Sequence, residues 1–241
     1  MYLSIYGPTN ISGSIPSRIG NCTNLVWLDL GWNYRIQGSL SMSIFRPPLS
    51  TLSLVANNLT GSIPEIIDNL SQISYLDMGA NSLTGAIPEA ITKLSQLTFL
   101  NLGTNKLIGR IPEGIKNLSS LEQLYLDTNY FTGTIPKDIG DLRFLKNFFL
   151  HLNNISGSIP ESISGLVSLQ QLSLSRNTLD GTIPNSIGQC LELEVLDLSK
   201  NNLKGNIPLS IGKCNLMKNL LLHSNYLLGI IPPTLSNCTF L

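Results

Sequence analysis

Residues 196–208 read LDLSKNNLKGNIP, and this segment decides how the rest of the chain is interpreted. Its asparagine at position 201 recurs every 24 residues, in most copies with an alternating leucine pair before it and a glycine followed by Ile-Pro after it. A fixed period of this length is typical of a solenoid, in which each repeat forms one coil that packs on its neighbours. The recurring asparagines are Asn33, Asn57, Asn81, Asn105, Asn129, Asn153, Asn177, Asn201 and Asn225.

Each part of the repeat predicts its own local structure. The Leu-x-Leu alternation has the period of a strand, so its leucines face a core and the residues between them face outward. Glycine and proline in the second half favour an extended or turn-like path. The Glu-x-Ile-x-x-Leu that follows, as in residues 89–94, has room for one 3₁₀ or helical turn.

The recurring asparagine lies among inward leucines, where an amide without partners would destabilise the fold. An amide carries two donors and an acceptor, so a column of asparagines can bond the backbone of its own coil and of the adjacent coils. We therefore interpret the column as a structural ladder. Nine equivalent ligand contacts are the alternative interpretation.

The full pattern, Leu-x-x-Leu-x-Leu-x-x-Asn-x-Leu-x-Gly-x-Ile-Pro, resembles the plant-specific type of leucine-rich repeat and covers essentially all 241 residues. The Gly-x-Ile-Pro half is what distinguishes the plant class. The resemblance implies an α/β repeat solenoid, a right-handed superhelix with a parallel β-sheet on its concave side and turns or 3₁₀ segments on its convex side. Proteins of this type are mainly ectodomains of receptor-like kinases and receptor-like proteins, and secreted inhibitors of cell-wall-degrading enzymes.

The repeats indicate one array of about ten 24-residue turns over residues 1–241, without a linker. Capping turns, which in this family usually carry paired cysteines, are not recognisable at either end, so we expect a fragment of a longer chain. The first residues do not read as a signal peptide, and no stretch is apolar over the roughly 18 residues that a membrane span requires. A serine/threonine kinase domain is expected only in a C-terminal part of the parent protein.

The four cysteines occupy one repeat position, which holds leucine in most other coils. We therefore expect small apolar core residues. Disulfide pairing among the last three is the alternative, because stacked coils lie about 5 Å apart. The cysteines are Cys22, Cys190, Cys214 and Cys238.

Composition and spacing argue against several function classes. The net charge is zero, 12% of the residues are charged and no basic run occurs, which disfavours nucleic acid and anionic membranes as primary partners. His151 and His223 lie three turns apart with no nucleophile recurring beside them, and no His, Cys or Asp cluster has metal-ligand spacing. We expect no enzymatic activity, cofactor or metal in this segment.

The outward positions of the strands carry more aromatic residues than a purely polar surface would. Trp27, Trp32 and Tyr75 are among them, and a group further along combines rings with polar side chains. Such a strip fits a peptide or protein ligand, whereas stabilisation of the sheet by cross-strand contact is the alternative. The candidate ligand-binding residues are Phe99, Tyr125, Asp127, Phe149, His151, Ser173 and Arg176.

Seven Asn-x-Ser/Thr sequons favour a secreted glycoprotein. With the resemblance, they indicate an extracellular recognition module of a receptor in cell-surface signalling, at the plasma membrane or in the cell wall, in defence or development. The expected partner is a peptide or protein ligand on the concave face, and a co-receptor is a further candidate. A secreted inhibitor of the polygalacturonase-inhibitor type is the alternative. The sequon asparagines are Asn10, Asn21, Asn58, Asn69, Asn117, Asn154 and Asn237.

Overall fold

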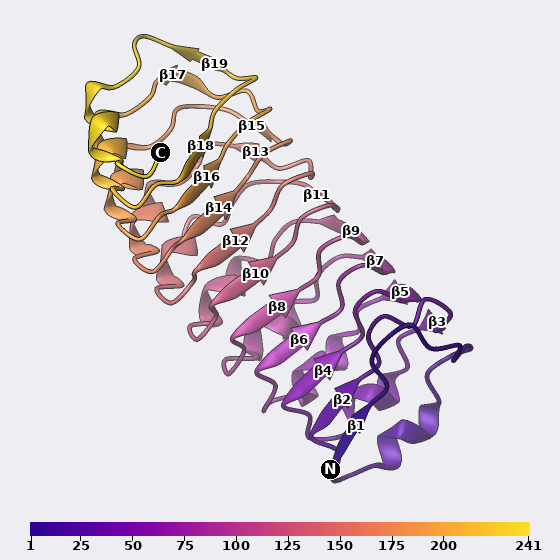
Figure 1. The fold of residues 1–241 in the computed structure, drawn as a ribbon. Coiled ribbons are helices and arrows are strands. Elements are labelled where there is room, and N and C mark those ends of the chain that lie inside the picture. The colour runs from indigo at the N-terminus through magenta and orange to yellow at the C-terminus, as the bar shows by residue number, and fades with distance from the viewer.

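Ten three-residue strands, most of them centred on the first leucine of a Leu-x-Leu segment, pair in parallel into one sheet along the whole computed structural model (Figure 1). The structure describes residues 1–241. Equivalent residues of neighbouring coils are partners, as Leu76 and Leu100 are. The strands, in spatial order, are β1 (Tyr2–Ser4), β2 (Trp27–Asp29), β4 (Thr51–Ser53), β6 (Tyr75–Asp77), β8 (Phe99–Asn101), β10 (Gln123–Tyr125), β12 (Asn147–Phe149), β14 (Gln171–Ser173), β16 (Val195–Asp197) and β18 (Asn219–Leu221).

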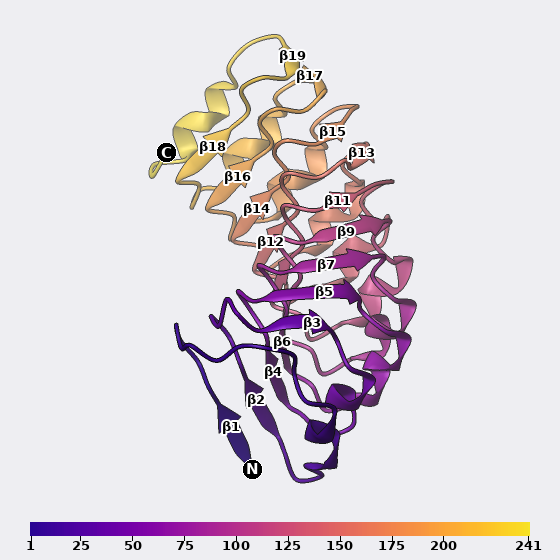
Figure 2. The same ribbon diagram turned by 90° about the vertical axis from the view of Figure 1, so that its right-hand side faces the viewer.

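The glycine-containing half of the repeat forms a second series of short parallel strands on another side of the stack (Figure 2). The sequence predicted an extended path here but not this pairing. Gly85 has a φ of 78°, and a Cβ there would come within 3.2 Å of the Ser62 Cβ, so glycine permits both the turn and the close stacking. The strands are β3 (Gln37–Ser39), β5 (Asn58–Ser62), β7 (Ser82–Gly85), β9 (Lys106–Gly109) and β11 (Tyr130–Phe131), then the pairs β13 (Ser156–Gly157) with β15 (Thr178–Leu179) and β17 (Lys204–Asn206) with β19 (Tyr226–Leu228).

A short 3₁₀ helix closes each coil, and Figure 2 shows these helices on the side away from the ten-stranded sheet, which lies on the inner side of the bend. Together with the stacked strands, they confirm the predicted solenoid. None of them has the length and apolar character that crossing a bilayer requires. They are η1 (Ser17–Asn21), η2 (Met42–Phe45), η3 (Glu65–Asn69), η4 (Glu89–Lys93), η5 (Glu113–Asn117), η6 (Ile139–Asp141), η7 (Glu161–Gly165), η8 (Asn185–Gln189), η9 (Leu209–Lys213) and η10 (Pro233–Asn237).

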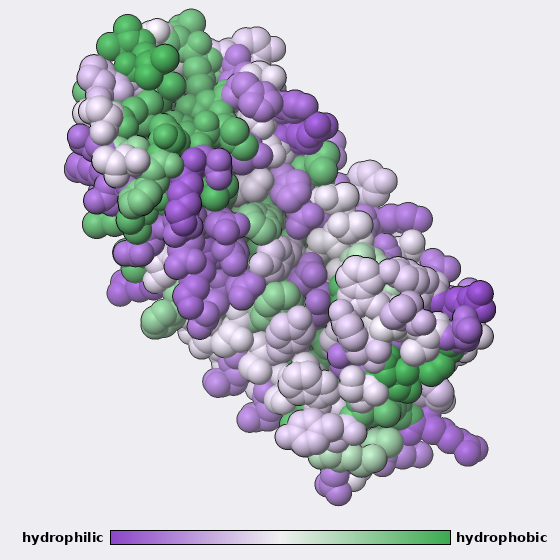
Figure 3. Space-filling view, in the orientation of Figure 1, coloured by the Kyte–Doolittle hydropathy of each residue, from purple (hydrophilic) through white to green (hydrophobic).

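One apolar core of 59 buried residues runs through the stack, so no coil has a core of its own. Each fully buried leucine contributes about 1.5–3 kcal/mol, but only while its neighbours are stacked against it. Cys190, Cys214 and Cys238 are buried in this core and Cys22 is partly buried, and all four are free thiols. The last coil exposes apolar side chains, including that of Leu228. Figure 3 shows a hydrophobic surface at the C-terminal end of the molecule.

The recurring asparagines bond the backbone of two coils at once. Asn129 Nδ2 donates to the carbonyls of Leu126 (3.3 Å) and Asp127 (3.1 Å) in its own coil, and to that of Leu102 in the preceding coil (2.9 Å). The residue before each of these asparagines has a φ between 51° and 62°, a left-handed conformation that is unusual outside glycine. This left-handed turn brings the asparagine amide over the carbonyls that it bonds. Because the turn residue is not glycine, the left-handed conformation could not be recognised in the sequence.

Candidate ligand-binding face

The first and third residues of each strand in the ten-stranded sheet point away from the core, and we call the surface that they form the sheet face. Aromatic rings contact one another across it. The ring centroids of Tyr75 and Phe99 lie 4.2 Å apart in a stacked arrangement, and those of Phe99 and Tyr125 lie 5.5 Å apart. Phe149 continues the series at 5.1 Å from Tyr125, and His151 follows at 6.1 Å from Phe149. These five residues form what we call the aromatic row.

The aromatic row crosses the sheet diagonally. Tyr75 and Phe99 are the first residues of β6 and β8, whereas Tyr125 and Phe149 are the third residues of β10 and β12. Phe99 is therefore in register with Gln123 and not with Tyr125. The large rings bridge this offset because aromatic side chains reach diagonal neighbours on a sheet. The result is a continuous apolar path with polar positions on both sides.

A polar pair lies at the C-terminal end of the aromatic row. The Nε2 atom of His151 is 3.7 Å from Asp127 Oδ2, which also accepts a hydrogen bond from the Thr128 hydroxyl at 3.1 Å. The Nδ1 atom of His151 is buried without a hydrogen-bond partner. Asp127 and His151 are thus positioned to fix the orientation of a ligand that packs on the rings.

Five of the seven residues that the sequence indicated lie together in this region, namely Phe99, Tyr125, Asp127, Phe149 and His151. Ser173 is the register partner of Phe149 on the next strand. Arg176 lies in the turn after β14 and is exposed, and its guanidinium makes no hydrogen bond or ion pair within the chain. The arginine is therefore free to meet a negatively charged group at the edge of the region.

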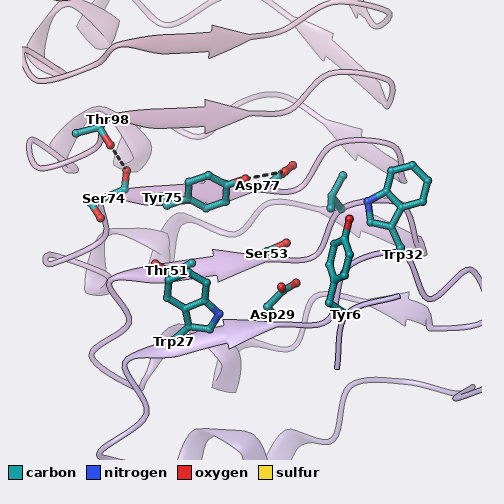
Figure 4. Close-up of a pocket in the computed structure, with 11 residues that line it drawn as sticks. Tyr6, Trp27, Asp29, Trp32, Thr51, Ser53, Ser74, Tyr75, Asp77 and Thr98 are labelled. Atoms are coloured by element: carbon teal, nitrogen blue, oxygen red, sulfur yellow. Dashed lines mark hydrogen bonds between the residues drawn. The ribbon is translucent and has the colours of Figure 1, made fainter. Parts of the chain in front are cut away.

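A hollow at the N-terminal end of the sheet face, with a volume of about 690 Å³, was not predicted from the sequence (Figure 4). It arises because β4 presents small side chains between the larger ones of β2 and β6. The signal was present as Thr51-x-Ser53, flanked one coil away on each side by an aromatic-x-Asp triplet. The residues that line this N-terminal hollow are Tyr6, Trp27, Asp29, Trp32, Thr51, Ser53, Val55, Ser74, Tyr75, Asp77 and Thr98.

Burial changes the acid–base properties of two groups in the N-terminal hollow. Asp77 is only 6% exposed, and its desolvation raises the pKa of the carboxyl above the ordinary value. Burial, followed by the charge of Asp77, raises the pKa of Tyr75 to about 12. The Tyr75 hydroxyl is therefore protonated at neutral pH, and it donates to Asp77 Oδ2 at 3.4 Å.

The sequon asparagines are all exposed, and none lies on a strand of the ten-stranded sheet. Asn21, Asn69, Asn117 and Asn237 are the last residues of four 3₁₀ helices. Asn58 begins β5, Asn154 precedes β13, and Asn10 lies in the loop after β1. No group of three or more His, Cys, Asp or Glu side chains is placed to hold a metal ion.

Sequence comparison identifies the family of this chain. Models of the leucine rich repeat match residues 47–107, 119–179, 192–214 and 217–238. The chain belongs to the leucine-rich repeat family. A search of curated protein sequences found no match to this leucine-rich repeat protein.

Solved structures resemble this leucine-rich repeat protein over its whole length. The Arabidopsis receptor kinase HAESA, in complex with the peptide hormone IDA and the co-receptor SERK1, matches with a TM-score of 0.95 and 34% identity. The plant peptide hormone receptor RGFR1, in complex with RGF2, matches with a TM-score of 0.90 and 35% identity. The match covers 100% of this chain in both cases, but 40% of the HAESA chain and 42% of the RGFR1 chain.

A bacterial protein shares the architecture as well. The Leptospira interrogans leucine-rich repeat protein LIC12759 matches with a TM-score of 0.82 and 32% identity over 99% of this chain and 58% of its own. The fold is therefore not limited to plant proteins. The matches to the plant receptors nevertheless confirm the resemblance to plant-type leucine-rich repeat ectodomains that the repeat pattern indicated.

Proposed function

We propose that this chain is part of the ectodomain of a plant cell-surface receptor, a receptor-like kinase or receptor-like protein, and that its sheet face binds a peptide or protein ligand. The observation that carries the proposal is the aromatic row together with its polar end, Asp127 and His151. Half-buried rings offer a large contact area at little entropic cost, and the polar groups fix the register of the bound chain.

The structural comparisons support a peptide as the ligand. HAESA and RGFR1 were solved with peptide hormones, and HAESA also with a co-receptor. By analogy, a co-receptor is a second partner of this chain, and the kinase of a receptor-like kinase would lie elsewhere in the parent protein. The mechanism that we propose is non-covalent binding without a catalysed reaction. The peptide lies along the aromatic row and completes a surface to which the co-receptor binds.

The positions of the sequons also support this proposal. Glycans on the 3₁₀ helices and at the start of the second series of strands would leave the sheet face uncovered. Glycans are bulky and hydrophilic, so a protein surface that binds a partner is usually kept free of them. An ectodomain on the outer side of the plasma membrane would carry such modifications.

A selection experiment tests the proposal. The protein is immobilised and used to select binders from a phage-displayed library of random 12-residue peptides, and the enriched peptides are synthesised. We expect Phe149→Ala to weaken them by about tenfold or more, because hot-spot aromatics contribute at least about 1.4 kcal/mol. Tyr130→Ala is the matched control, since Tyr130 is an exposed aromatic on β11, outside the sheet face. Equal losses in both variants, or none in either, would contradict the proposal.

A further inference from the structure

The N-terminal hollow has a repeated architecture. Trp27, Thr51 and Tyr75 are register partners on β2, β4 and β6. Two residues further along the same strands, Asp29, Ser53 and Asp77 are partners in the same order. Thr51 and Ser53 are both 7% exposed and form a low floor. An aromatic ring and a carboxylate therefore rise on each side of it, as Figure 4 shows.

The charge in this hollow is unbalanced. Asp29 and Asp77 are the only ionisable groups besides tyrosine among its lining residues, which include no lysine, arginine or histidine. Neither carboxylate forms a salt bridge, and their Oδ1 atoms are held by the backbone N–H groups of Gly31 (3.0 Å) and Gly79 (3.1 Å). Partly desolvated carboxylates without a cation are costly to the fold. A positively charged ligand would offset that cost.

The spacing suits one cation. Asp29 and Asp77 are two strands apart, so their Cα atoms lie about 10 Å from each other. They belong to no group of three or more His, Cys, Asp or Glu side chains that could hold a metal ion. A group placed above Ser53 would lie one strand spacing, about 4.8 Å, from each of the two strands. A planar, donor-rich cation there reaches either carboxylate, while the rings that flank Thr51 line the space beside it.

The aromatic side chains favour the same occupant. Trp27 and Trp32 are 40% and 43% exposed, and Tyr6 lies near Trp32 at the far end of the hollow (Figure 4). The face of an indole or phenol ring attracts cations, and a guanidinium also stacks on it. A volume of about 690 Å³ accommodates a long side chain with some of its adjoining backbone.

We infer that the N-terminal hollow binds a basic side chain, arginine in particular, of the peptide ligand. The inference rests on the proposed function and assigns one end of the ligand to this end of the sheet face. The guanidinium lies over Ser53 between the Asp29 and Asp77 carboxylates, with its stem packed between Trp27 and Tyr75. No covalent step is involved.

Tryptophan fluorescence tests this inference directly, because the chain contains two tryptophans and both line the N-terminal hollow. The protein is titrated with acetyl-Gly-Arg-Gly-amide and with the citrulline peptide of the same shape, which is neutral. We expect a saturable change with the arginine peptide and about tenfold weaker binding of the citrulline peptide. Equal responses to the two peptides would overturn the inference, as would a response only to a neutral cello-oligosaccharide, which would assign the rings to sugar stacking.

Matched variants locate the binding site. Asp29→Asn and Asp77→Asn should each weaken the arginine peptide by about fivefold to tenfold. Asp197→Asn is the control, because Asp197 holds the same repeat position on β16 and does not line the hollow. Ser53→Phe, which fills the floor and keeps both carboxylates, should abolish the fluorescence change. An effect of Asp197→Asn as large as that of Asp29→Asn would overturn the inference.

The outcome is separable from that of the proposed function. If the binding of the library peptides depends on Phe149 but not on Asp29 or Asp77, the proposed function is supported. The inference of an arginine site in the N-terminal hollow is then wrong. Thermal melting of each variant shows whether a loss of binding reflects a loss of folding. Ser53→Phe alters neither carboxylate, and Asp77→Asn leaves the floor of the hollow unchanged, so a common loss of binding in folded samples of both variants supports the site.

Discussion

The side-chain oxygen of Asn129 accepts a hydrogen bond from the backbone N–H of Leu107, 22 residues earlier in the chain, at 2.9 Å. Its nitrogen donates to the Leu102 carbonyl of that same coil. We expect Asn129→Leu to lower the free energy of unfolding by about 1–3 kcal/mol, because it leaves buried backbone groups without partners. Urea denaturation measures this change.

Asn202→Leu is the control for the ladder, because Asn202 is exposed, follows a ladder asparagine and makes no side-chain hydrogen bond in the structure. Its effect should stay within about 0.5 kcal/mol. If Asn129→Leu unfolds at the same denaturant concentration as the unmodified protein, the asparagine column does not stabilise the stack.

The stacked rings of Tyr75 and Phe99 should stabilise the fold, in addition to their proposed role in ligand binding. A double-mutant cycle with Tyr75→Ala and Phe99→Ala is expected to give a coupling energy of about 0.5–1.5 kcal/mol in the free protein. Additive effects of the two substitutions would mean that the contact adds nothing to stability. The aromatic row would then have no structural role at this point.

Stability near Asp77 should depend on pH. Burial raises the pKa of Asp77 in the folded protein, so the folded state holds this proton more tightly than the unfolded chain does. The stabilisation from protonation is complete below the unfolded pKa, near the ordinary aspartate value of 3.8, and is lost as the pH rises through the folded pKa. At pH 7 we therefore expect Asp77→Asn to be more stable than the unmodified protein, with the difference vanishing towards pH 3.8.

Thermal melting between roughly pH 3.5 and pH 7 measures this dependence, because carboxyl groups titrate in this range. Asp180→Asn, at an exposed position on the second side of the stack, reports the general effect of removing one carboxylate. A lower melting temperature of Asp77→Asn at pH 7 would show that the ionised carboxylate stabilises the fold.

The buried thiols should resist alkylation. Burial raises the pKa of Cys190 to about 12 and that of Cys214 to about 11, so neither is a thiolate at neutral pH. With iodoacetamide, we expect both to react at least about tenfold more slowly than the partly buried Cys22 in the native protein, and at similar rates in urea. Fewer than four modified cysteines in unfolded, unreduced protein would instead indicate a disulfide.

A glycan placed on the sheet face should block the ligand. Gln171→Asn on β14 creates an Asn-x-Ser sequon with Ser173, beside the register partners Phe149 and Ser173. Expressed in a plant secretory system, this variant should lose binding of the selected peptides, because the glycan covers the end of the aromatic row. Gln171→Ser, which removes the same side chain without creating a sequon, should retain binding. Full binding by the glycosylated variant would place the ligand elsewhere.

Local sequence pattern was sufficient to predict the solenoid, the strands and the 3₁₀ turns, since each depends on residue type at a fixed spacing. The pairing of the second series of strands was not predictable, because Thr84-Gly85-Ala86 is equally compatible with an unpaired extended loop. Membership of Tyr125 and Phe149 in one surface followed from their repeat positions. The contact of Tyr125 with Phe99 across the register did not, since it depends on side-chain reach between coils.

The sequence by itself determined which side chains face the core and which face outward, because a 24-residue period with inward leucines admits one arrangement of coils. Only the tertiary structure decided what the outward side chains form together. Trp27 and Tyr75 are 48 residues apart in the chain, and they become two walls of one hollow because parallel stacking places small Thr51 between them. That juxtaposition is a property of three neighbouring coils and of no single repeat.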